Sequence, residues 1–115
     1  MIEKVFHYTR LDTQAQERKI ERVIDDDNVA LNHMILIQGT EVPVHVSNSN
    51  AYMIIVRGSM TLALEDEPAN EHPAGEILAI PFNTKMRVTN ERPEALEFFV
   101  VKAPNPREMP AVKQL

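Results

Sequence analysis

Short apolar runs, separated by turn-forming residues, constrain the fold of this chain more than any other feature of its sequence. The runs are rich in Val, Ile and Phe, and clusters of Pro, Asn, Asp and Gly interrupt them every ~8–12 residues. This spacing is typical of an all-β sandwich or barrel. About eight strands in roughly 100 residues suit a jelly roll closed into a small barrel. We therefore predict an all-β jelly-roll barrel.

The strands can be assigned to particular segments of the chain. We expect strands at 4–9, 18–24, 29–37, 43–47, 51–57, 60–65, 76–81, 85–90 and 95–103. Residues 13–24 are also rich in helix formers, so a short helix there is the alternative to a hairpin that begins near Arg18. The hairpin is favoured because Ile20 and Ile24 alternate with charged residues.

The remaining segments fix the predicted domain organisation. Three prolines in residues 104–110 predict a tail that lies extended on the surface. We expect one domain over 1–115, with an N-terminal strand segment at 1–12, a barrel at about 18–103 and a Pro-rich tail at 104–115.

Charge and composition exclude several function classes. Acidic residues outnumber basic ones by 17 to 12, and the basic residues are scattered, so neither nucleic acid nor an anionic membrane is an expected partner. The chain has no cysteine, which excludes disulfides, zinc–thiolate sites and cysteine nucleophiles. The N-terminal segment lacks the apolar region of a signal peptide, and no apolar run could span a bilayer. These features predict a soluble, cytoplasmic protein.

Two spaced patterns in the chain resemble the motifs of the cupin family. In the first cupin motif, Gly is followed after five residues by His, after one more by a second His, after three or four by Glu and after six by Gly. In the second motif, Gly is followed after five residues by Pro, after one by Gly, after two by His and after three by Asn. The first set of positions is Gly39, His45, Ser47, Ala51 and Gly58. The second set is Gly75, Pro81, Asn83, Met86 and Asn90. The resemblance covers roughly residues 20–103 and implies the cupin double-stranded β-helix barrel.

The three glycines of the chain all fall on these framework positions. A glycine is expected in each tight turn between strands because such turns require a positive φ. Asn83 replaces a family glycine, and asparagine tolerates the left-handed conformation best among the other residues. The segments 47–62 and 81–86 look especially like small, single-domain bacterial cupins of unassigned function.

The metal ligands of the family are largely missing. Metal-binding cupins use the two His and the Glu of the first motif and the His of the second; these positions here hold His45, Ser47, Ala51 and Met86. One good ligand remains, whereas a divalent ion needs three or more N or O donors. We therefore expect no metal and no other cofactor, and the oxygenase or isomerase chemistry of metal-bearing cupins is not implied.

A rebuilt metal site is one alternative. His33 alternates with Leu31, Ile35 and Ile37, and we expect this odd-numbered face to point into the barrel. An inward His33 could approach His45, and the pair with Met86 would suit Cu(I). A hydrogen-bonded barrel histidine, or one that lines a cavity, is the favoured interpretation of His33.

These observations lead to a functional hypothesis. We expect a metal-independent cupin that binds a small, mainly apolar molecule, with His45 and Ser47 as polar groups and Met86 and His33 in the wall. A metal-dependent cupin enzyme with a site around His45 and His33 is one alternative, and a structural or regulatory dimeric barrel without a ligand is the other. No recognisable catalytic set is present and the metal ligands of the motifs are largely missing, so the sequence leans against an enzymatic activity and does not decide it.

A second copy of the chain is the expected partner. Residues 51–57 and 95–101 carry apolar side chains on both faces, and the barrel interior buries only one of them. A symmetric partner is the usual cover for the other face. We predict a homodimer to which Val5 and Tyr8 contribute.

Overall fold

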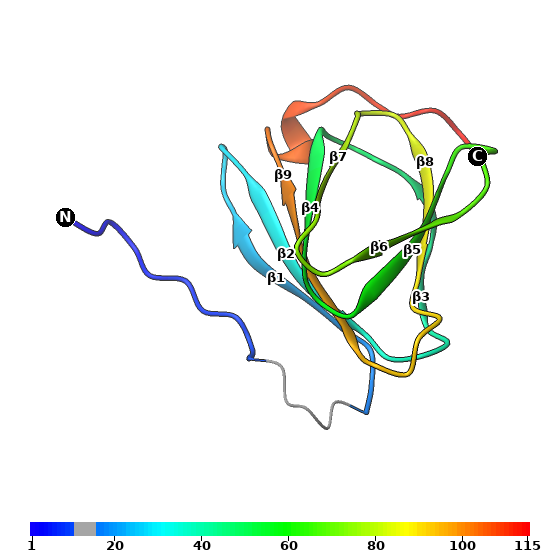
Figure 1. Ribbon diagram of the computed structural model, residues 1–115. Coiled ribbons are helices and arrows are strands. Elements are labelled where there is room, and N and C mark those ends of the chain that lie inside the picture. Colours follow the sequence, from blue (N-terminus) through cyan, green and yellow to red (C-terminus); the bar gives the residue numbers. More distant parts are fainter. Residues whose placement is uncertain (11–15) are drawn as a thin grey trace.

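Two antiparallel sheets form the fold in the computed structural model, which describes residues 1–10 and 16–115 (Figure 1). The elements are β1 (Lys19–Asp25), β2 (Ala30–Leu36), β3 (Glu41–Val46), β4 (Ala51–Arg57), β5 (Ser59–Leu64), β6 (Asn70–Pro73), β7 (Ile77–Ile80), β8 (Lys85–Thr89), β9 (Leu96–Lys102) and the 3-10 turn η1 (Pro106–Glu108). A five-stranded sheet has the order β1-β2-β9-β4-β7, and a four-stranded sheet has the order β3-β8-β5-β6. This architecture confirms the predicted all-β jelly roll.

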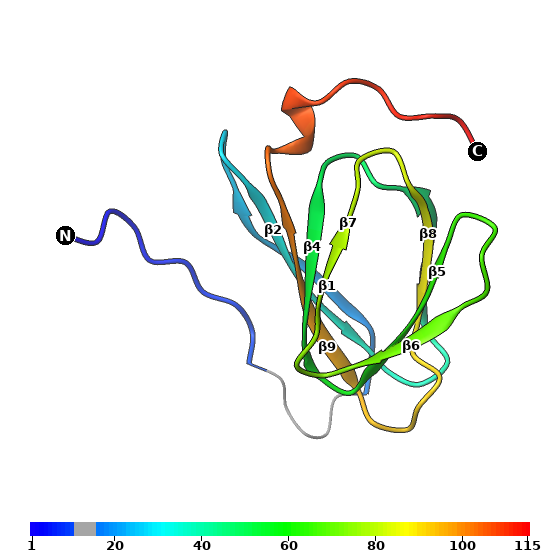
Figure 2. The same cartoon turned by 45° about the horizontal axis from the view of Figure 1, so that its top comes forward.

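The two sheets face one another and enclose the core (Figures 1 and 2). Side chains alternate between the two faces of each strand, so on β9 Leu96, Phe98 and Val100 point inward and are buried. On β4, Met53 and Ile55 point inward in the same way. The apolar groups therefore meet between the sheets, and the interior of the barrel is the place where a ligand could be enclosed.

Turns with positive φ join the strands where the sequence predicted them. Gly58, between β4 and β5, has a φ of 77°, and a Cβ there would lie 2.5 Å from the Ala95 carbonyl oxygen. Asn83 has a φ of 67°, which confirms that it replaces glycine in the left-handed conformation. Asn83 also accepts a hydrogen bond of 2.8 Å from the backbone N–H of Lys113, so the turn is held from outside as well.

Two segments differ from the predicted strands. Residues 4–9 form no strand, although their apolar residues predicted one, because they pair with no strand among the described residues 1–10 and 16–115. β6 forms in a stretch where the sequence predicted no strand, because the turn-forming segments 65–70 and 72–75 cover most of it. β6 is an edge strand, and an edge strand that buries few side chains leaves little hydrophobic pattern in the sequence.

The strand at β1 confirms the hairpin interpretation. Residues 19–25 pair antiparallel with β2, so this part of the helix alternative is wrong. Residues 13–15 of that alternative, and residues 11–12 of the predicted N-terminal strand segment, lie outside the described residues. The assignment of the whole chain to one domain stays a prediction.

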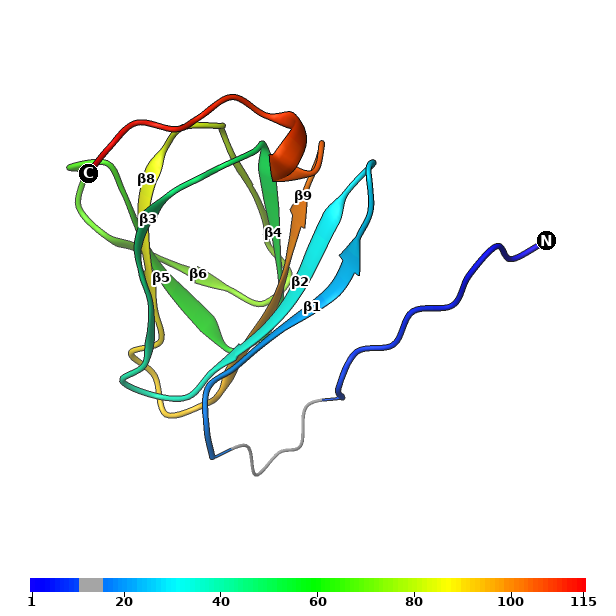
Figure 3. The same cartoon turned by 180° about the vertical axis from the view of Figure 1, so that it is seen from behind.

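The tail that follows β9 crosses one end of the barrel (Figure 3). It begins with the short turn η1, and the side-chain amide of Asn105 is buried, where it donates to Asp25 Oδ1 at 2.6 Å and to the Asp26 carbonyl at 2.9 Å. The rest of the tail runs extended to the far sheet. In residues 1–10 and 16–115, no helix is long and apolar enough to cross a membrane.

Candidate functional site

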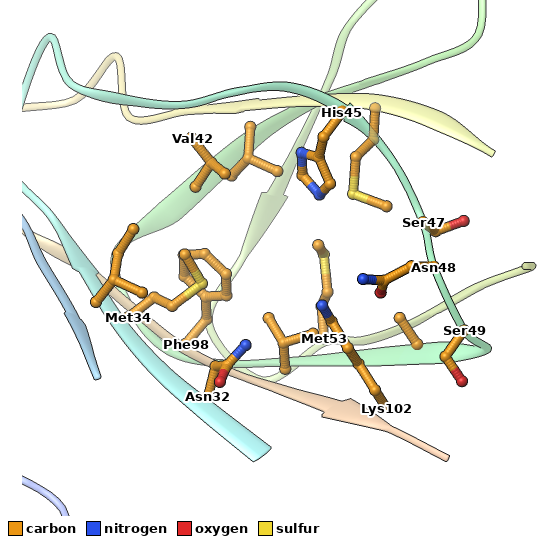
Figure 4. A pocket seen from close by; sticks show the side chains of 15 residues that line it. Asn32, Met34, Val42, His45, Ser47, Asn48, Ser49, Met53, Phe98 and Lys102 are labelled. Carbon is orange, nitrogen blue, oxygen red and sulfur yellow. The ribbon is translucent and has the colours of Figure 1, made fainter. Parts of the chain in front are cut away.

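A cavity of about 210 Å³ lies between the two sheets (Figure 4). Its wall is mainly apolar, with side chains from both sheets: Met34, Val42, Met53, Met86, Phe98 and Val100. At about 30 Å³ for a water molecule in the liquid, the space holds on the order of seven water-sized groups. It therefore suits a compact ligand rather than a cofactor the size of a nucleotide.

His45 projects from β3 into this cavity (Figure 4). Its Nδ1 lies 2.9 Å from the Pro43 carbonyl oxygen. Because a carbonyl oxygen only accepts, Nδ1 carries the proton, and the neutral ring then presents Nε2 as an acceptor. The Pro43 contact thus fixes both the tautomer and the orientation of the ring. The position predicted for His45 is the one observed.

Ser47 lines the cavity but does not offer its hydroxyl to it. The Ser47 Oγ donates to the Pro81 carbonyl oxygen and accepts from the Thr84 backbone N–H at 2.8 Å. Figure 4 shows the hydroxyl turned away from the interior. The expectation of an inward hydroxyl is therefore wrong: Ser47 ties the end of β3 to the turn before β8.

Met86 stands in the cavity wall, as the motif spacing predicted. It lies on β8 directly opposite His45 on β3, and it is buried in the core. A thioether adds a soft, adaptable apolar surface beside the imidazole. Ala51, the third replaced ligand position, also lines the cavity from β4.

His33 lies outside the cavity, on the opposite face of the five-stranded sheet. The even-numbered residues of β2, Met34 and Leu36, belong to the core, so the predicted inward direction of the odd-numbered face is wrong. Both faces of this strand are apolar, so the alternation of side chains along it does not show which face points into the barrel. His33 therefore takes no part in the wall of the barrel cavity.

The surroundings of His33 form a separate polar cluster. Its Nδ1 lies 2.7 Å from Glu21 Oε1 and its Nε2 lies 2.6 Å from Glu97 Oε2, while the ring stacks on Phe99 and contacts Tyr8. Burial raises the pKa of Glu21, but hydrogen bonds from Thr9 and His33 outweigh burial and leave this pKa below its usual value. These contacts satisfy the buried imidazole at both nitrogens.

The positions of the two histidines rule out the rebuilt metal site that pairs them. His45 is inside the barrel and His33 is behind the five-stranded sheet, so they cannot share an ion. Within residues 1–10 and 16–115, no three His, Asp or Glu side chains gather closely enough to hold a metal ion. The donors left at the cupin ligand positions are one imidazole and one thioether.

Sequence reasoning missed the polar end of the cavity, which Asn32, Asn48 and Lys102 form. Lys102 ends β9 on the same face as Phe98 and Val100, and Figure 4 shows its side chain reaching into the cavity. Burial lowers the pKa of Lys102, and the positive charge of Arg22 lowers it further. The alternation along β9 was a usable signal for Lys102, but both cupin motifs end before this strand.

Comparison with known proteins places the chain in a family. It is 41% identical over 111 residues to an uncharacterised protein of Methanocaldococcus jannaschii, covering 96% of this chain and 93% of the relative. The crystal structure of that protein, described as an RmlC-like cupin family protein with a double-stranded β-helix fold, superimposes with a TM-score of 0.86 over 94% of this chain and 96% of the other. The chain therefore belongs to the RmlC-like cupin family.

More distant structures share the fold alone. A conserved double-stranded β-helix protein of Klebsiella pneumoniae has a TM-score of 0.75 at 19% identity, covering 90% of this chain and 86% of the other. A cupin superfamily protein of Desulfitobacterium hafniense has a TM-score of 0.69 at 12% identity, covering 78% and 82%. No model of a protein family matches the chain.

Proposed function

We propose that this cupin binds a small, mainly apolar molecule in its barrel cavity without a metal ion at the cupin ligand positions. The observation that carries the proposal is the mainly apolar cavity between the two sheets, into which His45 points. A pocket with an apolar wall and few polar groups is typical of small-molecule binding sites. A cytoplasmic location, expected from the sequence, stays a prediction.

The replaced ligand positions support binding rather than metal chemistry. Ala51 and Met86 place apolar groups where metal-binding relatives would place donors, and Ser47 uses its hydroxyl for the backbone. His45 keeps one acceptor nitrogen available to a ligand. The four positions together thus form an apolar surface with a single polar atom, which fits the wall of a binding cavity.

Filling the cavity tests the proposal. Ala51→Leu places three more carbon atoms in the cavity, whereas Ala63→Leu adds the same atoms on the outer face of β5. Small probes with an apolar body and one polar group, such as hexanamide and hexanoate, are titrated and followed by backbone NMR shifts. We expect binding to the wild type and to Ala63→Leu, and loss of at least about 10-fold in affinity for Ala51→Leu.

Two results would contradict this function. One is equal binding by the Ala51→Leu and Ala63→Leu variants, because the probe would then occupy another surface. The other is a full equivalent of tightly held iron, zinc, manganese or nickel that is lost on replacing His45, because the site would then be a metal centre. We expect elemental analysis to find well under one equivalent.

The partner we propose is a second copy of the chain, docked on the outer face of the five-stranded sheet. This face exposes Tyr52, Val56 and Ile77 from β4 and β7, next to Phe99 on β9. A contiguous exposed apolar surface of this kind marks an interaction site. Solvation of so many apolar groups disfavours a solitary barrel.

The N-terminal arm, residues 1–10, points to the same partner. It leaves the barrel on the outer side of the five-stranded sheet, where Tyr8 contacts Phe99 at a centroid distance of 5.0 Å (Figures 1 and 3). Beyond that anchor Ile2 and Val5 are exposed. In a two-fold dimer each arm can cross to the apolar face of the other copy. The same symmetric interface then buries both the arm and the apolar face.

A further inference from the structure

The polar end of the barrel cavity is also the rim of a second, more polar pocket. Asn32, Asn48 and Lys102 line both the barrel cavity and this outer pocket, which Arg22 and Asp25 also line. These three side chains therefore stand at the junction between an apolar interior and a polar surface. A ligand that extends through this junction has an apolar end inside and a polar end beside Lys102.

The charge balance at the junction favours an anionic group. Among the described residues that line the outer pocket, Asp25 has the one carboxylate, and it is already paired with Arg22 at 3.4 Å and with Arg107 at 3.3 Å. The charged neighbour that acts on Lys102 is Arg22, a second cation. Lys102 thus brings a half-buried positive charge to the cavity, and a buried charge is stabilised by a partner of opposite sign.

The hydrogen-bonding groups at the junction suit two oxygens. The ammonium of Lys102 can only donate, and the side-chain amides of Asn32 and Asn48 each hold two N–H donors. In Figure 4 the ends of the Lys102 and Asn48 side chains point toward one another, and Asn32 lies across the drawn interior from Asn48; all three residues line both pockets. A carboxylate offers two acceptor oxygens and one negative charge, which matches one ammonium and neighbouring amides.

We propose that the molecule held in the cavity is a small monocarboxylic acid, with its carboxylate at Lys102 and its apolar body between Met53, Met86 and Phe98. This inference rests on the proposed binding function and names the ligand class. Among the described residues, Arg22 and Arg107 at this junction are paired with Asp25, and Lys102 has no ion pair, so one cation is left to match a singly charged group, whereas a phosphate dianion would need more positive charge. A cavity of about 210 Å³ limits the body to a short aliphatic chain or one small ring.

A pair of ligands that differ only in charge tests the inference. Hexanoate and hexanamide have the same chain and nearly the same shape, and both are titrated into the full-length protein near neutral pH with calorimetry and backbone NMR shifts as readouts. We expect hexanoate to bind at least about 10-fold more tightly, the scale of a charge-assisted hydrogen bond in a half-buried site.

Variants at Lys102 locate the source of that preference. Lys102→Met keeps most of the length of the side chain and removes the charge, so we expect hexanoate and hexanamide to bind it equally, with the affinity for hexanamide within about 3-fold of the wild type. Lys102→Gln is the second variant, in case the methionine alters folding. Lys19→Met removes a positive charge from the exposed part of β1 and should leave the preference for hexanoate unchanged.

The outcomes separate this inference from the function on which it rests. Equal binding of hexanoate and hexanamide to the wild type, both lost in Ala51→Leu, would overturn the carboxylate assignment and leave cavity binding intact. A preference for hexanoate that survives both Lys102 variants would also overturn it. Shifts confined to residues outside the barrel cavity for both ligands would overturn the inference and the proposed function together.

Discussion

Lys102 places an ammonium group, which water solvates well, against the apolar wall of the barrel cavity. Its pKa is lowered in the folded protein, first by burial and then by the charge of Arg22. The folded state therefore binds this proton less tightly than the unfolded state does, so the charged side chain opposes folding. The loss of stability is complete below the folded-state pKa and disappears as the pH rises toward the ordinary value of 10.5.

The destabilising effect of charged Lys102 gives a prediction for the ligand-free protein. Lys102→Met should raise the melting temperature near pH 7 by a few degrees, because it removes the desolvated charge and adds apolar contact. The difference from the wild type should shrink as the pH approaches 10.5. Differential scanning calorimetry across this range measures it. A lower melting temperature for Lys102→Met than for Lys19→Met would show that the charge stabilises the fold.

Residues of the site differ in how far the sequence could place them. His45 and Met86 were placed correctly because the spacing of two glycine-anchored motifs fixes their strands and their inward direction. Ser47 was placed on the right strand, but sequence spacing does not tell where a hydroxyl finds its partner. Lys102 was missed because it lies outside both motifs, and His33 was assigned to the wrong face because its strand is apolar on both sides.

At the scale of elements, β6 shows how a polar edge strand is attached to the barrel. Glu71 on β6 accepts a hydrogen bond of 2.7 Å from Arg92 Nη2, in the connector between β8 and β9, and one of 2.9 Å from Ser59 Oγ on β5. These contacts, that from Arg92 first, lower the pKa of Glu71 from 4.5 to about 2. The four residues of β6 bury little, so this exposed cluster contributes to holding the strand on its sheet.

The lowered pKa of Glu71 fixes the direction of a pH effect. A carboxylate whose folded-state pKa lies below the unfolded value stabilises the fold above pH 4.5, and that stabilisation is lost as the pH falls toward about 2. Wild type should therefore melt above Glu71→Gln near neutral pH, by a small margin because the pair is exposed. The margin should close between these two pH values. Glu67→Gln, on the exposed turn before β6, should show no such closing margin, and a constant margin for Glu71→Gln would contradict the assignment.

A strand could be predicted where the burial of one of its faces leaves a hydrophobic pattern in the sequence, and could not be predicted where it buries little. The core strands β4, β8 and β9 were all expected from the sequence, because alternation and flanking turn residues agree there. The segment 4–9 is also rich in strand-forming residues, but it pairs with no strand in the part of the chain that the structure describes. Apolar residues in a segment show that it can be buried, but the segment's own sequence does not identify the partner that buries it.

At the scale of the whole molecule, the proposed dimer uses the apolar outer face of the five-stranded sheet together with the N-terminal arm. A dimer through this face leaves the end of the barrel near Lys102 and Asn48 outside the interface, because those side chains lie on the inner face and at the strand ends. Ligand entry and dimerisation are therefore separable in this arrangement, and variants of the face can be tested without a change in the cavity.

Two valines of equal exposure test the dimer. Val56 is 46% exposed on the outer face of β4, and Val44 is 48% exposed on β3 in the other sheet. Sedimentation equilibrium at micromolar concentration should give about twice the chain mass of 13.1 kDa for the wild type and for Val44→Glu. Val56→Glu should sediment close to 13.1 kDa, because a carboxylate in the centre of an apolar interface loses its water without gaining a partner. Removal of residues 1–6 should weaken association while hexanamide binding in the cavity persists. A wild type that sediments as a single chain, or equal effects of the two glutamates, would show that this face is not the interface.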